Sequence, residues 1–147
     1  MSQGASSADQ ERTLEQKRAA DALACVERVK AEGGRVDLAA YRSYVERLGS
    51  AIIMNGLGQA LATELAAAGP KDKQKGGDER AHQWLYDNLN GWLCRKDGGV
   101  YPGAGNVLEA LMQGSQSAYV RAQMEALAWL EWHKKFCQAA LPRREEG

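Results

Sequence analysis

Hydrophobic residues recur every three or four positions along most of this sequence, which is the pattern of amphipathic α-helices. The strict apolar and polar alternation of strands is almost absent. Glycine, proline and polar clusters divide the pattern into six segments. They predict helices from Thr13 to Gly33, from near Asp37 to Ile52, from Asn55 to Gly69, from Asp78 to Lys96, from Asn106 to Gly114, and from about Ser117 to Leu141. We therefore expect an all-α protein, a compact single-domain bundle of about six helices.

Several predicted helices begin with residues that can cap the first turn. The stretches TLEQ (13–16) and NVLE (106–109) have the spacing of capping boxes. In this motif the first side chain accepts from the backbone N–H of the fourth residue, and the fourth side chain accepts from the backbone N–H of the first. Asn55 and Asp78 are the expected N-caps of the third and fourth helices, because short polar side chains accept from unpaired N–H groups. Gly69 with Pro70 should end the third helix.

The periodicity also predicts which faces are buried. In the first helix we expect an inward stripe of Ala22, Leu23, Val26 and Val29, and an outward face of Lys17, Asp21 and Arg28. In the second helix the inward stripe is Leu38, Tyr41, Val45, Leu48 and Ile52.

The last helix is apolar on two sides. Its core stripe is Tyr119, Ala122, Ala126, Leu130, His133 and Cys137. The other side carries Met124, Ala128 and Trp132 together with Arg121, Glu131 and Lys135. A second apolar side indicates either a central helix or contact with another molecule, and we favour a partner.

Length and composition restrict the class of protein. A chain of 147 residues suits one domain, which we expect at 13–141 with a polar loop at 70–77, a disordered tail at 1–12 and a flexible tail at 142–147. The net charge of zero gives no long-range attraction to nucleic acid, so any anion site must be a local patch. Three cysteines without paired spacing favour free thiols in a reducing cytosol. With no apolar run that could span a bilayer, we expect a cytoplasmic protein without membrane contact.

The stretch NGLGQAL (55–61) places Gly56 and Gly58 in the first turn of a helix. It lacks the third glycine of a dinucleotide fingerprint and the Gly-Lys-Ser/Thr of a P-loop. Bare backbone at this point allows the close approach of either a neighbouring helix or a ribose-phosphate chain, and the sequence leaves both open.

Residues for catalysis or metal binding are sparse. His133 and Cys137 have helical spacing, but a zinc site needs three or four ligands, so we expect no metal and no cofactor. No serine or cysteine lies in a nucleophile motif, and the two histidines offer little material for acid-base chemistry. We therefore do not expect an enzyme.

Three stretches occur together in this order: TLEQKRA (13–19), NGLGQALA (55–62) and LEALMQGSQSAYVRAQMEALAWLEWHKKF (108–136). In combination they resemble the small all-helical subunit of the type III-B CRISPR RNA-guided effector, the Cmr complex of the RAMP superfamily. The resemblance extends from Thr13 to about Ala139. It implies a non-catalytic subunit that lines the channel for guide RNA and target RNA. Such subunits contact phosphates without reading bases, and they touch the backbone subunit, the large polymerase-like subunit and further copies of themselves.

This resemblance and the basic positions together define candidate RNA contacts. We expect phosphate contacts from Lys17, Arg18, Arg42, Arg121 and Lys135. Asn55 and Gln59, at the bare helix start, are further polar candidates. Met124 and Trp132 are candidates for packing between subunits, where aromatic anchors are common.

A helical adaptor that binds only protein is the alternative hypothesis. It is motivated by the zero net charge and by the apolar outer side of the last helix. RNA crosslinking within the assembled complex separates the two hypotheses, because the adaptor predicts no crosslinks to this chain.

Overall fold

The computed structural model describes residues 12–145, and within this range it contains six α-helices, one 3-10 turn and no strand. The elements are α2 (Leu14–Ala31), η1 (Gly33–Arg35), α3 (Leu38–Asn55), α4 (Leu57–Ala68), α5 (Gly77–Leu93), α6 (Val107–Gln113) and α7 (Gln116–Ala140). The predicted all-α bundle of six helices is confirmed. The tail expected at 1–12 lies outside the described residues, except for its last position.

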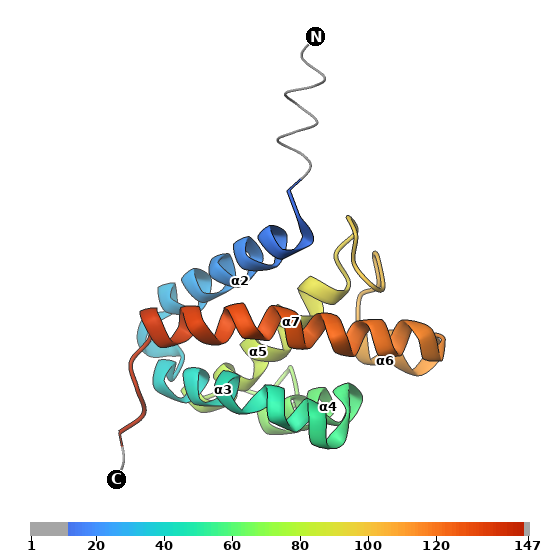
Figure 1. Ribbon diagram of the computed structural model, residues 1–147. Coiled ribbons are helices and arrows are strands. Elements are labelled where there is room, and N and C mark those ends of the chain that lie inside the picture. Colours follow the sequence, from blue (N-terminus) through green and yellow to red (C-terminus); the bar gives the residue numbers. More distant parts are fainter. Residues whose placement is uncertain (1–11, 146–147) are drawn as a thin grey trace.

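The longest helix, α7, runs through the middle of the bundle (Figure 1). It packs against α2 on one side and α3 on the other, and α4 and α5 close the remaining side. The short helix α6 lies beside α4 and leads into the start of α7 (Figure 1). No helix within residues 12–145 is both long enough and apolar enough to cross a bilayer.

The centre of the core contains a hydrogen-bonded polar group that is packed among apolar side chains, including the Trp129 ring stacked on His133. Tyr41 of α3 and His133 of α7 are fully buried, and the Tyr41 hydroxyl lies 2.6 Å from His133 Nε2. His133 Nδ1 lies 3.0 Å from the Ala22 carbonyl oxygen, so this nitrogen carries the proton and Tyr41 donates to Nε2. The Asn88 side chain donates to the Tyr41 hydroxyl at 2.9 Å. Every polar atom of the pair therefore has a partner, as burial requires.

Two predicted helix starts are confirmed. Thr13 caps α2 with the reciprocal Gln16 contact of a capping box. Asn106 caps α6 by accepting from the N–H groups of Leu108 and Glu109, and the Val107 N–H donates to Asn90. The reciprocal Glu109 contact of the predicted capping box is not among the hydrogen bonds of residues 12–145. Both motifs act locally, because the cap and the groups it satisfies lie within three residues. Such starts can therefore be predicted from sequence alone.

Two predicted N-caps are wrong. Asn55 is the last residue of α3, and Gly56 alone joins α3 to α4 with a φ of 88°. That left-handed conformation favours glycine and leaves no room for a separate capping residue. Helix α5 begins at Gly77, so Asp78 lies in its first turn, where it accepts a hydrogen bond from the Tyr44 hydroxyl instead.

The predicted buried faces are largely confirmed, with exceptions on α2. Leu23 is 42% exposed, although we expected it inward. Asp21, expected on the wet face, is half-buried and accepts a hydrogen bond from the Trp129 indole at 2.9 Å. Trp129 itself is fully buried and lies outside the stripe expected for the last helix. The face of α7 that packs against α2 is therefore wider than the face predicted from the spacing of its hydrophobic residues.

The bare start of α4 is explained by contacts with α7. The Gly58 N–H donates to the Tyr119 hydroxyl at 2.9 Å, and the Leu57 N–H donates to Gln123 Oε1 at 3.0 Å. A Cβ at Gly58 would lie 3.3 Å from the Tyr119 oxygen. The sequence left open whether a neighbouring helix or a ribose-phosphate chain approaches this backbone. In the structure, side chains of the neighbouring helix α7 approach it.

Candidate nucleic-acid interface

Two predicted cations lie on one stripe of α7 beside α2. Arg121, Glu125, Trp132 and Lys135 follow one another at helical spacing, so their side chains share one side of the helix. Glu125 and Trp132 bond to the first turns of α2, which places the stripe along that helix. Arg121 and Lys135 are exposed and about 21 Å apart along the axis.

Lys17 adds a third exposed cation from the first turns of α2. Its neighbour Arg18 contacts Glu125, which brings this turn close to the stripe. Within residues 12–145, no ion pair holds Lys17, Arg121 or Lys135. We call these three residues the cationic edge.

Arg18, another predicted phosphate contact, is engaged inside the protein. Its guanidinium is 19% exposed and lies 2.5 Å from a carboxylate oxygen of Glu125, which is 9% exposed. Removing Arg18 would leave a nearly buried carboxylate without its counter-ion. Arg18 therefore serves the packing of α2 on α7.

Arg42 is separated from the cationic edge and bonds to the end of α7. Its guanidinium donates to the carbonyl oxygens of Leu141 at 3.1 Å and Gln138 at 3.4 Å. Cations stabilise helix C-termini, where carbonyl groups are unpaired. The Arg42 side chain is 13% exposed, and its Nε lies 3.8 Å from a Glu46 carboxylate oxygen.

Asn55 and Gln59 are exposed but lie on a different side of the molecule from the cationic edge. Their segment contacts Tyr119 and Gln123, which are about half a turn away from Arg121 around α7. The structure thus does not join these two amides to the predicted cations.

The end of α5 brings a cation that sequence reasoning did not select. Arg95 lies over the Trp92 ring, 3.4 Å from its centroid, and donates to the Trp92 carbonyl at 2.6 Å. Burial lowers the pKa of the Arg95 guanidinium, while nearby Glu125 and Asp21 oppose that change. These neighbours place Arg95 beside the Arg18–Glu125 pair. The only sequence signal was the position of Arg95 and Lys96 at a helix end.

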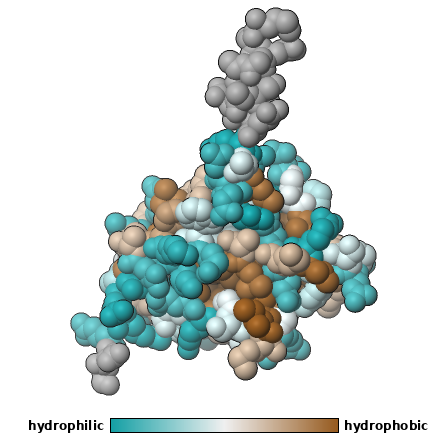
Figure 2. Space-filling model, viewed as in Figure 1, coloured by the Kyte–Doolittle hydropathy of each residue, from teal (hydrophilic) through white to brown (hydrophobic). Residues whose placement is uncertain are grey.

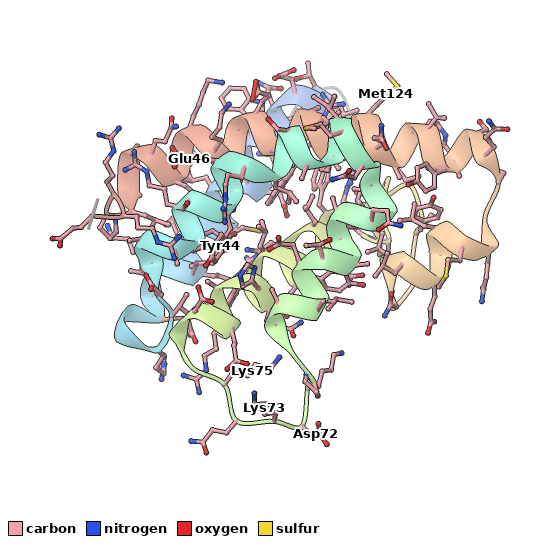
Figure 3. The ribbon with its side chains drawn as sticks, turned by 90° about the horizontal axis from the view of Figure 1, so that it is seen from below. Tyr44, Glu46, Asp72, Lys73, Lys75 and Met124 are labelled. Carbon is pink, nitrogen blue, oxygen red and sulfur yellow. The ribbon has the colours of Figure 1, made fainter. Side chains whose placement is uncertain are left out.

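The two predicted interface residues on α7 have different environments. Met124 is 66% exposed and points away from the bundle (Figure 3). Trp132 is half-buried, stacks on Phe136, and donates its indole N–H to Glu15 of α2 at 2.7 Å. Part of the apolar outer side of α7 is therefore covered by α2, whereas Met124 stays free.

The residues considered for metal binding or catalysis lie in the core. Both ring nitrogens of His133 are hydrogen-bonded, and burial lowers its pKa to about 4. Burial raises the pKa of the Cys25 and Cys137 thiols to about 12, so both remain protonated at neutral pH. Within residues 12–145, no group of three or more His, Cys, Asp or Glu residues could hold a metal ion.

A second polar cluster lies between α3, α4 and α5, and no sequence pattern indicated it. His82 Nδ1 is 2.9 Å from Glu64 Oε1, and the His82 ring stacks on Tyr44 at 3.9 Å between centroids. Burial raises the Glu64 pKa, and the hydrogen bond from His82 opposes that rise. Asp78 accepts from Tyr44, and Arg144 contacts both. The charges of this cluster are paired with one another, which indicates a structural role.

The comparisons with known proteins agree on one family. Residues 14–140 match the model of a family described as CRISPR-associated protein (Cas_Cmr5). The fold is similar to an X-ray crystal structure of a CRISPR-associated Cmr5 family protein from Thermus thermophilus, with 28% sequence identity and a TM-score of 0.64. That match covers 89% of this chain and all of the other. Among curated proteins, none matches the sequence.

Proposed function

This chain belongs to the Cmr5 family of CRISPR-associated proteins, which are subunits of the type III-B Cmr complex, and on that premise we propose that it contacts the RNA backbone within that complex without catalysing a reaction. The contact surface is the cationic edge of Lys17, Arg121 and Lys135. The observation that carries the proposal is that Arg121 and Lys135 share one exposed stripe of α7 beside α2, with Lys17 exposed on the neighbouring turn of α2. Within residues 12–145, no carboxylate forms an ion pair with any of the three.

The geometry of the cationic edge fits backbone contact rather than base recognition. Arg121 and Lys135 are about 21 Å apart along α7, which is the distance of several nucleotides in an extended strand. Lysine and arginine side chains of this kind bind phosphate oxygens, which are the same at every position of the RNA. Guide pairing supplies sequence recognition in RNA-guided complexes, so the protein needs only backbone contacts.

One subunit of zero net charge binds RNA weakly, so affinity must come from assembly. Each phosphate contact to a single strand contributes about 0.7 to the slope of log affinity against log salt. Three contacts give a slope of only about 2 for one subunit. Several copies held in register raise the effective concentration of each further contact. We therefore expect the subunit to act beside the guide RNA, the target RNA and further copies of itself.

The test compares two double charge reversals that change the net charge equally. Arg121→Glu with Lys135→Glu should weaken RNA capture by the reconstituted complex and lower its salt slope by about 1.4 per subunit. Lys71→Glu with Arg143→Glu changes exposed cations elsewhere and should have little effect. RNA crosslinks should map to peptides that contain Lys17, Arg121 or Lys135. Equal capture by both variants, with no crosslinks to this chain, would instead support the protein-only adaptor.

A further inference from the structure

Two stretches that meet at one end of the bundle carry no charged side chain. Residues 48–63 and 110–120 contain no Asp, Glu, Lys, Arg or His, although 26% of the sequence is charged. The fold brings these two stretches together, because the Gly58 N–H donates to the Tyr119 hydroxyl at 2.9 Å. The end of α3, the start of α4, the end of α6 and the start of α7 therefore form one uncharged surface, which we call the neutral end.

Most exposed hydrophobic side chains gather on the neutral end or directly beside it. Residues 12–145 contain seven large hydrophobic side chains that are exposed, and five of them lie here. They are Ile53 (71%), Met54 (82%), Met112 (78%), Val120 (50%) and Met124 (66%). Figure 2 shows hydrophobic side chains gathered where α7 passes the junction of α3 and α4. Clustered apolar side chains on a protein surface mark a binding site more often than scattered ones do.

A shallow hollow of about 490 Å³ lies within this surface, between α4, α6 and the start of α7. Its walls are mostly apolar and are formed by Gly58, Gln59, Ala62, Leu108, Met112 and Tyr119. Two helices with a gap between them offer the groove into which side chains of a third helix can pack. The bare backbone of Gly58 forms part of this groove.

The chemistry of the neutral end selects a protein partner. RNA binding needs cations, and the two stretches that form this end have none. Adsorption to an anionic membrane surface also needs lysine or arginine beside the apolar face. An uncharged apolar surface instead fits an equally uncharged protein surface, because a charge placed against it would lose its water without gaining a partner.

The size of the groove favours a single helix over a second copy of the chain. A stable dimer interface uses about 20 to 30 residues on each side, whereas seven residues line this groove. One amphipathic helix docks through about four apolar anchors at helical spacing, which a groove of this size can accommodate. Methionine is suited to such a groove, since its flexible thioether adapts to the shape of the partner.

We propose that the neutral end docks an amphipathic helix of another protein subunit, whose contacting stripe is apolar and uncharged. The docked helix lies in the groove between α4 and α6 and covers Ala62 and Met112. The groove, which includes Tyr119, lies about half a turn around α7 from Arg121, so helix docking and RNA contact use different sides of the subunit. The proposal rests on membership of a multi-subunit complex and is independent of the RNA contact.

The test uses the reconstituted Cmr complex with its other subunits and guide RNA. Ala62→Asp combined with Met112→Asp should abolish incorporation of this subunit, because two carboxylates would be buried under the helix. Leu14→Asp combined with Leu23→Asp is the matched control, since both leucines are exposed on α2, and it should incorporate normally. A photoreactive phenylalanine at Gln59, which lines the groove, should crosslink to a helical segment of another subunit. Circular dichroism of each free variant should equal that of the native chain.

Each outcome bears on one proposal only. Normal incorporation of the Ala62 and Met112 variant overturns the docking proposal and leaves RNA contact at the cationic edge standing. A crosslink from Gln59 to a second copy of this chain, or to RNA, also overturns it. If the native chain is incorporated normally but forms no RNA crosslinks, the RNA proposal is overturned instead. That result does not affect the docking proposal.

Discussion

Acidification should destabilise this protein through His133, which is buried and neutral in the folded state. Burial lowers its pKa from 6.5 to about 4, because the enclosed ring cannot be hydrated when it is charged, while the hydrogen bond to the Ala22 carbonyl opposes the change. The unfolded chain therefore binds a proton on this side chain at a higher pH than the folded chain does. The stabilisation is fully present above pH 6.5 and is lost as the pH falls toward 4.

The size of the effect follows from the two pKa values. Each pKa unit corresponds to about 1.4 kcal/mol, so the difference between 6.5 and about 4 amounts to about 3 kcal/mol at low pH. About 2 kcal/mol of this should be lost between pH 7 and pH 4.5. This is a large part of the 5 to 15 kcal/mol typical of a domain.

Urea denaturation at pH 7 and pH 4.5 measures this loss. The variant His133→Gln keeps a neutral side chain that can donate to the Ala22 carbonyl and accept from Tyr41, but it cannot titrate. Its stability should be lower at pH 7 and should fall less on acidification, by about 2 kcal/mol. Other titrating groups contribute equally to both proteins, so they cancel in the comparison. The same loss in both proteins would show that His133 already carries a proton in the fold.

Three further substitutions test individual contacts by the same urea method. Gly56→Ala should lower the free energy of unfolding by about 1 to 2 kcal/mol, because the residue has a φ of 88° and a Cβ would lie 3.3 Å from the Tyr119 oxygen. An unchanged urea midpoint would show that alanine is not strained at this position. Asn106→Ala should cost about 1 kcal/mol by removing the cap of α6, and Asn106→Asp should restore most of it. Arg18→Gln should cost about 2 kcal/mol by leaving Glu125 unpaired. Adding Glu125→Gln to this variant should recover part of the lost stability. If Arg18 served only to bind RNA, the second substitution would not restore stability.

Features that depend on neighbouring residues could be predicted from the sequence. The capping box at Thr13 and Gln16 and the cap at Asn106 each need only a few adjacent positions, and both are present in the structure. The helical period also places Tyr41, Val45 and Ile52 in the core, where they lie. The family resemblance, based on three stretches in order, is confirmed by the match over residues 14–140.

Features that depend on partners far along the chain could not be predicted. Glu125 lies 107 residues from Arg18, and no local pattern indicates that the two charges meet. Arg42 reaches carbonyl groups of the last helix for the same reason. At Gly56 the error arose from a local rule, because Asn is a better N-cap than Gly in general. Here the backbone needs a positive φ, which decides the residue type instead.

The single-residue connection at Gly56 also determines the permitted length of the chain at that point. One inserted residue would rotate α4 by about 100° relative to α3, and it would carry the inward side chains Leu57 and Leu61 away from the core. The loop that carries Asp72, Lys73 and Lys75 has no such constraint, since it extends beyond the ends of α4 and α5 (Figure 3). Family members should therefore differ in length within this loop and keep a constant spacing across the α3–α4 elbow.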